Sequence, residues 1–502
     1  MLKRFLLLPV LIATVHLSVA QAVKDAEKYV AIISEEGLKD KLSILASDAL
    51  EGRLTGSRGQ KMAAAFIAHH FETSGLIGPV GNSYFQKVPL KETKPLVNNL
   101  IINEQKYENY GDMFFLGVDH FEGIKSAPIV FAGLGKVEDL QKLDCRNKAV
   151  LILSGKLDNQ IFSSIAEQAT LLREKGAQAV VAIPDATEEE FNNYAGRIEG
   201  FLGNGMMALE NSPAPRLPNV FFAKKKIAEE IFSVSWDKLS DIASGKSNKK
   251  LRESRIGWQN QTSTRNFTSE NVLGYLEGTD KKDELVVVTA HFDHVGLTGD
   301  PKDPVFNGAD DDGSGTAAVM QLAEAFTKAY QEGTKPRRSI LFMTVTGEEE
   351  GLFGSAHYVA NPVFPLSQTV VDLNIDMIGR SDPQHSTDNK YVYVIGSDKL
   401  STELHKLHEQ INTTYSGLTL DYTYNDEKHP EQLYYRSDHW NFAKNSIPII
   451  FYFDGIHEDY HKATDEVSKI DFDALTKRTR LIFRTAWELA NRENRPAIDR
   501  GR

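Results

Sequence analysis

The sequence predicts an α/β protein whose mixed, mostly parallel sheet is flanked by helices and whose chain carries a smaller inserted domain. Two observations in the C-terminal half predict the main fold. Short apolar runs alternate with helical segments, and side chains of metal-binding types follow the ends of those runs. Such alternation is typical of a parallel sheet covered by helices on both faces. The strand-like runs are residues 285–290, 340–345, 370–377 and 447–453.

Helical periodicity accompanies these runs. Residues 316–328 have apolar positions at helical spacing between the first two runs, and residues 471–491 have the pattern of a closing amphipathic helix. In the N-terminal part, two helical patterns surround a Gly-rich turn at residues 51–59. These segments are the helices that we expect to cover the sheet.

Length and pattern changes divide the chain into domains. At 502 residues the chain exceeds what one hydrophobic core usually supports. Residues 23–106 are predicted to be the N-terminal part of the main domain. Residues 107–255 change character and are predicted to form the inserted domain, of α/β or β-rich type. Residues 256–502 complete the main domain and contain the metal-type side chains.

Residues 1–22 are predicted to be a signal peptide. Lys3 and Arg4 precede an apolar run at residues 5–15, and small residues that suit cleavage follow it. This run is too short to span a bilayer as a mature helix, and no later stretch reaches about 18 apolar residues. We therefore expect an exported chain, periplasmic or extracellular, whose mature form has no membrane span.

Charge and cysteine content exclude several functions. The net charge is −12, and no block of Lys and Arg interleaved with aromatic residues occurs, so nucleic acid is not an expected partner. Cys145 is the only cysteine, which excludes an intramolecular disulfide. It lies just before a strand-like run, where a structural position is more typical than a nucleophile. The sequence leaves the oligomeric state open.

Acidic and histidine side chains follow the ends of the predicted strands. The carboxyl ends of parallel strands share one edge of a sheet, where ligands and catalytic groups gather. Clustered carboxylates repel one another unless a cation offsets their charge. The pattern therefore predicts a metal-dependent hydrolase. Its five candidate ligands are His291, Asp311, Glu349, Asp376 and His461.

The neighbours of these residues suggest supporting roles. Asp293 is placed to accept a hydrogen bond from the second ring nitrogen of His291 and so to orient the ring. Glu348 and Glu349 are adjacent, so one can bind metal while the other acts as a general base.

The last histidine is ambiguous, because His457 and His461 lie four residues apart. We prefer His461, since Asp465 is placed to support it if the segment turns back.

At these residues the chain resembles the M28 family of zinc aminopeptidases. The resemblance covers the C-terminal half and the N-terminal segment that begins at residue 51, while the middle resembles a protease-associated domain less specifically. It implies the α/β zinc-peptidase fold and two Zn2+ ions per chain. The motifs that carry it are HFDH at 291–294, GADDDGSGTAAV at 308–319, GEEEGLFGS at 347–355, NIDMIG at 374–379, SDHW at 437–440 and YHKATDE at 460–466.

The resemblance also implies roles for single residues. Asp311 would be the carboxylate that both zinc ions share, favoured over Asp310 by its spacing from Gly308. Glu348 would be the general base, which takes a proton from the bridging water and delivers it to the leaving amine. The remaining implied ligands are Glu349 and His461 at one site and His291 and Asp376 at the other.

Two finer features follow from the same resemblance. Tyr434, three residues before the SDHW motif, matches a tyrosine that stabilises the oxyanion in some members, although its neighbour Tyr435 leaves this assignment open. The shared carboxylate of the family precedes a cis peptide bond, which we therefore expect between Asp311 and Asp312.

The predicted function is that of an exported di-zinc exopeptidase that hydrolyses N-terminal residues from peptides. Two adjacent metal ions would polarise the scissile carbonyl and hold the free α-amine of a peptide substrate. A dipeptidase or carboxypeptidase of the same family is the alternative. A glutaminyl cyclase, with one zinc and no hydrolytic water, and a non-catalytic binding protein are disfavoured by the complete set of ligands. The preferred substrate side chain stays open.

Overall fold

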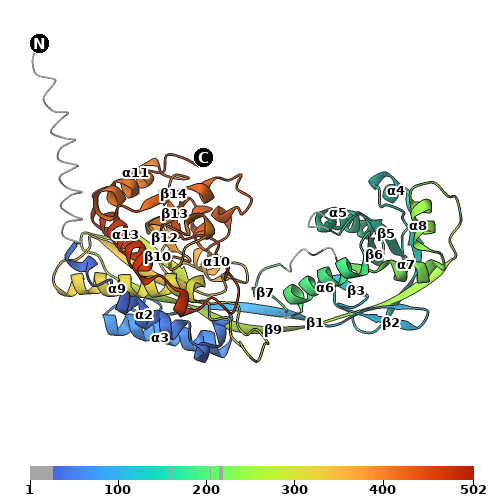
Figure 1. The fold of residues 1–502 in the computed structure, drawn as a ribbon, viewed down its shortest axis with the longest axis horizontal. Coiled ribbons are helices and arrows are strands. Elements are labelled where there is room, and N and C mark those ends of the chain that lie inside the picture. Colours follow the sequence, from blue (N-terminus) through green and yellow to red (C-terminus); the bar gives the residue numbers. More distant parts are fainter. Residues whose placement is uncertain (1–26, 158–160, 204, 214–216, 218, 502) are drawn as a thin grey trace, which may run out of the picture. The chain divides into compact units, whose positions relative to one another are not determined.

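The computed structural model describes residues 27–157, 161–203, 205–213, 217 and 219–501 (Figure 1). The predicted signal peptide, residues 1–22, lies outside this part of the chain. The chain divides into two compact units. Unit 1 comprises the residues up to Pro89 together with Phe267 onward, and unit 2 comprises Leu90–Asn266.

The boundaries between the units differ from those expected at residues 106/107 and 255/256. Both boundaries fall inside long strands, β1 (Phe85–Ile102) and β9 (Ser254–Leu276). Each strand continues without a break in secondary structure from one unit into the other. No turn or change in composition therefore marks the border in the sequence, and the inserted unit extends further at both ends than the sequence pattern indicates.

Unit 1 contains a mixed, mostly parallel sheet, which confirms the predicted fold class. β10 pairs in parallel with β11 and β12, β12 pairs in parallel with β15, and β13 pairs in parallel with β14. The antiparallel pairs are β13 with β15 and β11 with β9. In spatial order the strands are β14 (Thr419–Asp421), β13 (Tyr391–Ile395), β15 (Ile449–Phe453), β12 (Thr369–Ile375), β10 (Lys281–His291), β11 (Arg338–Val345) and β9.

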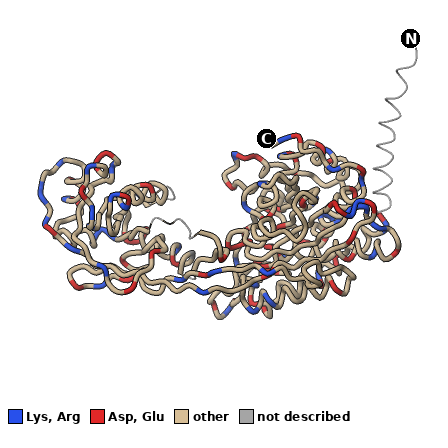
Figure 2. The backbone as a smooth tube through the Cα atoms, turned by 180° about the vertical axis from the view of Figure 1, so that it is seen from behind, with Lys and Arg blue, Asp and Glu red and all other residues tan. Residues whose placement is uncertain are grey.

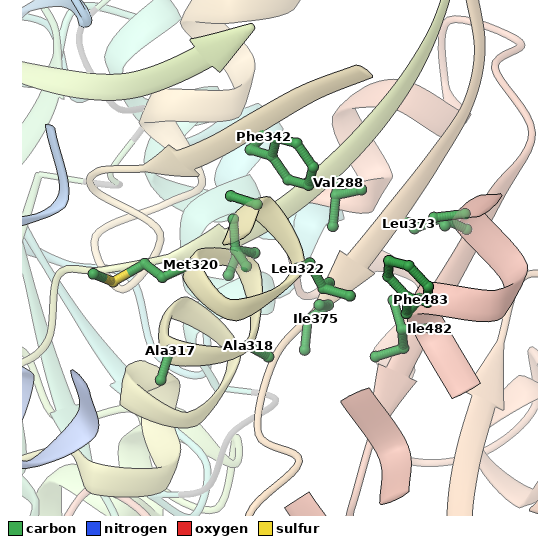
Figure 3. Close-up of a cluster of buried hydrophobic side chains, with 14 of the residues drawn as sticks. Val288, Ala317, Ala318, Met320, Leu322, Phe342, Leu373, Ile375, Ile482 and Phe483 are labelled. Carbon is green, nitrogen blue, oxygen red and sulfur yellow. The ribbon is translucent and has the colours of Figure 1, made fainter. Parts of the chain in front are cut away.

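One face of this sheet packs against the longer helices of unit 1. Successive strand residues point to opposite faces, so alternate positions enter this core. Figure 3 draws part of it, in which Val288 and Phe342 of the strands share one cluster with Leu322 of α9. The helices are α2 (Glu35–Leu45), α3 (Arg58–Ser74), α9 (Gly315–Gln331), α11 (Thr402–Ile411) and α13 (Phe472–Asn491). The helices expected at 316–328 and 471–491 correspond to α9 and α13.

The opposite face is covered by shorter helices. Val287 and Leu341, one residue away from positions in the first core, pack here with Tyr358 of α10 (Phe353–Ala360) and Phe442 of α12 (His439–Ala443). The connections contain short helical turns, which are η1 (Asp48–Arg53), η2 (Ala309–Ser314), η3 (Leu366–Gln368), η4 (Pro383–His385), η5 (Asn412–Ser416), η6 (Thr423–Asn425), η7 (Leu433–Tyr435) and η8 (Val467–Lys469).

Unit 2 is an α/β unit with its own core. β5 pairs in parallel with β4 and β6, β6 pairs in parallel with β8, and β3 pairs antiparallel with β8. β5 and β6 are buried throughout. The strands are β2 (Gln105–Glu108), β3 (Met113–Leu116), β4 (Lys125–Phe131), β5 (Ala149–Ser154), β6 (Ala179–Pro184), β7 (Met206–Leu209) and β8 (Val220–Ala223). The helices are α4 (Val137–Lys142), α5 (Ile161–Glu174), α6 (Glu188–Leu202), α7 (Lys225–Phe232) and α8 (Trp236–Ala243).

Three further features of the described residues bear on general expectations from the sequence. Among their helices, none has both the length and the apolar character needed to cross a membrane. Basic and acidic residues are both scattered along the backbone of each unit (Figure 2). The lone Cys145 is buried in a hydrophobic cluster of unit 2, as expected for a structural cysteine.

Candidate metal centre

The candidate ligands lie on loops that leave neighbouring strands of unit 1 at their carboxyl ends. His291 is the last residue of β10, and Asp376 directly follows β12. Glu348 and Glu349 lie in the turn after β11. Asp311 lies in η2, directly before α9, and His461 lies on the loop after β15. The topology thus brings residues far apart in the sequence to one edge of the sheet, as the strand pattern predicts.

The first group of side chains is centred on His291. Its Nε2 atom lies 3.4 Å from Oδ1 of Asp311, 3.6 Å from Oδ1 of Asp376 and 3.8 Å from Oε2 of Glu348. His291 is 1% exposed. Oδ2 of Asp376 accepts a hydrogen bond of 2.7 Å from the Ser437 hydroxyl, which leaves Oδ1 facing His291.

The second group is centred on His461. Its Nε2 atom lies 3.0 Å from Oδ2 of Asp311 and 3.0 Å from Oε2 of Glu349. Asp311 therefore presents one carboxylate oxygen to each group. This is the arrangement expected of a ligand that two metal ions share.

The three aspartates of η2 have different contacts. Asp310 accepts a hydrogen bond from the Gly379 amide through Oδ1 at 2.7 Å. Asp312 accepts hydrogen bonds from the amides of His291 and Met377 at 3.1 and 3.0 Å. Only Asp311 faces both groups, and a cis peptide bond joins it to Asp312, as the resemblance implies.

The two candidate histidines of the last loop have different contacts. Nε2 of His457 lies 3.2 Å from Oδ2 of Asp310, whereas His461 contacts the candidate ligands. The expectation that Asp465 supports His461 is wrong. The Asp465 carboxylate instead accepts hydrogen bonds from the backbone amides of Asp310 and Asp311 at 3.0 and 3.1 Å. It holds the backbone of Asp310 and Asp311 in place.

Asp293 contacts His291 through its backbone and Glu348 through its carboxylate, a division that the sequence does not predict. Its backbone carbonyl oxygen lies 3.2 Å from Nδ1 of His291, while its carboxylate is 3.8 Å from the same atom. The carboxylate accepts hydrogen bonds from the Glu348 amide at 3.2 Å and from the Thr55 hydroxyl at 2.9 Å. Asp293 thus connects the loop of His291 to the turn of Glu348.

The sequence reasoning missed His294, the second histidine of HFDH. Its ring is buried, and Nδ1 lies 2.8 Å from Oε1 of Glu349 and 3.9 Å from Oδ2 of Asp311. Potential ligand atoms of His294, Asp311 and Glu349 all lie within 4.8 Å of one another, as do those of His291, Glu348 and Asp376. The position of His294 inside a motif was visible in the sequence, but its ring partner depends on the fold.

A cavity adjoins these groups and is partly apolar. Asp311, Glu348 and Asp376 line it on one side. Its other lining residues are Met377, Leu433, Arg436, Ser437, Phe451, Phe453, Ile456 and Tyr460.

The tyrosine in this cavity is Tyr460, not Tyr434. The ring of Tyr460 stacks on His461 with centroids 3.9 Å apart. Burial and the charges of nearby acids, Asp311 first among them, raise its pKa strongly. Within the described chain, Tyr434 is absent from the cavity lining, and its ring packs against Trp440 and His439 instead. The expected placement of Tyr434 in the site is therefore corrected.

The electrostatics of the site favour bound positive charge. Burial lowers the pKa of His291, but the charges of Glu348 and Asp376 outweigh it and raise the pKa well above its usual value. Burial likewise opposes protonation of His461, yet its contacts with Asp311 and Glu349 raise its pKa to about 10. Burial and repulsion from Asp376 and Glu349 raise the pKa of Glu348 well above its usual range. A cation offsets this repulsion.

The donor set fits zinc. Nε2 of His291 is buried and, among the residues that the structure describes, has no hydrogen-bond partner although three carboxylates surround it. A metal ion between these atoms would satisfy all of them. Imidazole nitrogens and carboxylate oxygens are the ligands of catalytic zinc sites that retain an open position.

Comparisons with known proteins match the part of the chain that carries the candidate site to a peptidase family. The model of Peptidase family M28 matches residues 271–486. Aminopeptidase YwaD of Bacillus subtilis (strain 168) is 25% identical over 386 residues, covering 74% of this chain and 68% of the relative. Leucine aminopeptidase 1 of Trichophyton equinum is 28% identical over 246 residues, covering 47% of this chain and 62% of the relative.

Solved structures share the fold. An aminopeptidase from Aneurinibacillus sp. strain AM-1 superposes with a TM-score of 0.59 at 20% identity, covering 94% of this chain and 98% of that one. BSAP, a zinc aminopeptidase from Bacillus subtilis, superposes with a TM-score of 0.53 at 19% identity, covering 92% and 96%.

Proposed function

We propose that this chain, whose residues 271–486 belong to peptidase family M28, is a di-zinc aminopeptidase that removes N-terminal residues from peptides. The observation that carries the proposal is the position of Asp311. Its two carboxylate oxygens face two separate groups of ligand-type side chains, at 3.4 Å from His291 and 3.0 Å from His461. The relatives named as aminopeptidases support the substrate class.

The proposed zinc ligands follow from this geometry. Asp311 would contact both ions. The first ion would also be held by His291 and Asp376, and the second by Glu349 and His461. Two zinc ions at these positions would supply Lewis acidity, which polarises a carbonyl group and lowers the pKa of a water molecule, and a docking point for the substrate α-amine.

Glu348 is the proposed general base. Oε2 of Glu348 faces the His291 group, and its backbone amide is held by Asp293. From the cavity wall this carboxylate can take a proton from the attacking water and return it to the leaving amine. Since Glu349 contacts both His294 and His461, it is the ligand of the two adjacent glutamates.

Tyr460 takes the role first expected of Tyr434. Its ring lines the cavity beside Glu348 and Asp311. A phenol that keeps its proton at neutral pH can donate a hydrogen bond to the oxygen that becomes negative as the peptide carbonyl is attacked. The raised pKa of Tyr460 keeps the hydroxyl in its donating form.

Dipeptidase or carboxypeptidase activity is the alternative, and one residue favours it. Arg436 lines the cavity, and a guanidinium binds carboxylates well. However, Nη1 of Arg436 already lies 2.6 Å from Oε2 of Glu431, so the group is partly neutralised within the chain. Aminopeptidase activity is therefore the primary proposal.

The proposed export rests on the sequence, where a positively charged start precedes a short apolar run. N-terminal sequencing of the chain recovered after expression with residues 1–22 present tests this part. A mature chain that begins near residue 23 in the periplasm or medium is expected. Retention of residues 1–22 by an intracellular chain would contradict it.

Three versions of one peptide separate the proposed activity from its alternatives. The zinc-loaded protein is incubated with a free peptide, its N-acetylated form and its C-terminally amidated form. An aminopeptidase releases the first residue from the free and amidated forms only. Cleavage of the N-acetylated peptide with loss on amidation would instead establish a carboxypeptidase. A dipeptide is tested alongside, and cleavage of the dipeptide alone would establish a dipeptidase.

A further inference from the structure

A turn from the N-terminal part of the chain, residues 52–55, lies against the loops of the candidate metal centre. Arg53 at its centre is 1% exposed and has a left-handed φ of 51°. Gly52 precedes it, and a Cβ atom there would lie 2.1 Å from the carbonyl oxygen of Gly296. The backbone of the turn therefore approaches the loop after β10 more closely than any other residue type would allow.

The Arg53 guanidinium joins the two ligand loops. Nε donates to the carbonyl oxygen of Phe292, the residue after His291, at 2.8 Å. Nη1 and Nη2 donate to the carbonyl oxygens of Asn307 and Gly308 at 2.7 and 2.9 Å. The planar, rigid guanidinium fixes the spacing between these carbonyl groups. One side chain thus connects the end of β10 to the loop that carries Asp311.

Backbone and hydroxyl contacts of the same turn reinforce this connection. The carbonyl oxygens of Arg53 and Gly52 accept hydrogen bonds from the amides of His294 at 3.3 Å and Gly296 at 3.0 Å. The Thr55 hydroxyl donates to the Asp293 carboxylate at 2.9 Å. The other oxygen of that carboxylate holds the amide of the proposed general base, at 3.2 Å. The turn therefore contacts two segments that carry proposed ligands and is linked through Asp293 to a third, which carries the proposed base.

We propose that the turn at residues 52–55, through Arg53 and Thr55, positions the two metal-binding loops for catalysis. Arg53 and Thr55 are then positioning residues, since neither lines the cavity as described. The inference rests on the proposed di-zinc function. Its physical reason is that a misplacement of about 1 Å in a catalytic group costs on the order of 100-fold in rate. Lysine at position 53 keeps the charge but loses the planar fork that spans both loops.

Arg338 provides a matched control within unit 1. Its guanidinium is fully buried, pairs with Glu284 at 2.6 Å, and donates to three backbone carbonyl groups. Those carbonyl groups belong to the C-terminal part of the chain, at Leu489, Arg492 and Glu493, away from the proposed ligands. Arg338→Lys therefore also removes a buried guanidinium that donates to several backbone carbonyl groups, but it leaves the loops that carry the proposed ligands unchanged.

The test compares Arg53→Lys and Arg338→Lys in the full chain. We measure the melting temperature without metal, the Kd for zinc, the visible spectrum of the Co2+-loaded protein, and kcat and KM with saturating zinc. Both variants should have a lower melting temperature than the wild type. Only Arg53→Lys should weaken zinc binding about tenfold or more, change the Co2+ spectrum and lower kcat about 100-fold with KM little changed.

The proposal is overturned if Arg53→Lys matches Arg338→Lys in zinc Kd, Co2+ spectrum and kcat. Should Arg53→Lys not fold, Thr55→Val is compared with Thr327→Val, which removes a buried hydroxyl inside α9. Thr55→Val should then lower kcat about tenfold and shift the Co2+ spectrum, and wild-type values for both would overturn the proposal. A wild-type protein without zinc-dependent peptidase activity would instead reject the proposed function, whatever the variants do.

Discussion

Oδ2 of Asp311 lies 3.0 Å from Nε2 of His461. This contact selects one histidine and one aspartate from repeated residues in the sequence. His457 and Asp310, the nearest alternatives, pair with each other at 3.2 Å instead. The chain thus keeps one acid–histidine pair beside the cavity and another as internal support. The same distinction gives the first testable prediction.

His461→Ala should mainly affect zinc binding, whereas His457→Ala should mainly affect stability. His461 is more than one-third exposed, so its removal should weaken binding of one zinc ion with little loss of stability. His457→Ala leaves the Asp310 carboxylate buried without its partner, which should cost about 3 kcal/mol in the free energy of unfolding while two zinc ions still bind. Urea unfolding and metal content distinguish the variants, and a loss of zinc from His457→Ala alone would reverse the assignment.

Glu348→Gln should keep its zinc and lose its turnover. Glutamine preserves the shape of the side chain but cannot accept the proton, so kcat should fall about 1,000-fold. Glu349→Gln should instead weaken zinc binding, since Glu349 contacts His461. Metal analysis and steady-state kinetics of both variants test this division of labour. Equal zinc loss in Glu348→Gln would show that the two roles were exchanged.

Tyr460→Phe should lower kcat about 100-fold, because one hydrogen bond to the developing oxyanion is lost. Tyr434→Phe serves as the control, since its ring packs against Trp440 outside the described cavity lining. Its kcat should stay within about twofold of wild type. The kinetic comparison fails to support the account if Tyr434→Phe is the slower enzyme.

Glu488→Gln should stabilise the protein at pH 8 but much less at pH 5. Burial raises the pKa of Glu488 to about 7, although the charge of Arg492 opposes the shift. A raised folded-state pKa contributes stability that is present below the unfolded-state value and is lost as pH rises through about 7. Glutamine stays neutral, so a gain of about 1–3 kcal/mol is expected at pH 8. Urea unfolding at both pH values measures it, with the half-exposed Glu409→Gln as control. An equal effect of Glu488→Gln at the two pH values would contradict a raised pKa of Glu488.

Metal removal should lower the melting temperature. The carboxylates of Glu348 and Asp376 face the same histidine, and their repulsion is offset by a bound cation. At a free zinc concentration about 100-fold above Kd, each site adds about 2.7 kcal/mol. Thermal unfolding with zinc and with a chelator tests this, and identical transitions would contradict a metal site here.

Much of the fold could be predicted because strand and helix periodicity is local information. The runs that became β10, β11, β12 and β15 are rich in apolar residues and are buried on both faces toward their carboxyl ends, which is typical of a covered parallel sheet. The unit boundaries could not be predicted, since β1 and β9 continue through them without a turn.

The site was predictable to the level of motifs but not of contacts. Local sequence cannot tell which of two nearby side chains faces a loop from another strand. Asp465 therefore turned out to hold the Asp311 peptide, and Tyr460 rather than Tyr434 entered the cavity. Nothing in the sequence indicated that Arg53 supports the site, because its partners are backbone carbonyl groups of loops distant in the sequence.

Zinc titration of metal-free wild-type and Asp311→Asn protein shows whether one carboxylate serves two zinc ions. Two zinc ions should bind per wild-type chain, and binding at both sites should be weaker in Asp311→Asn, because one carboxylate serves both. One zinc ion that binds Asp311→Asn with wild-type affinity would contradict the claim that Asp311 is shared.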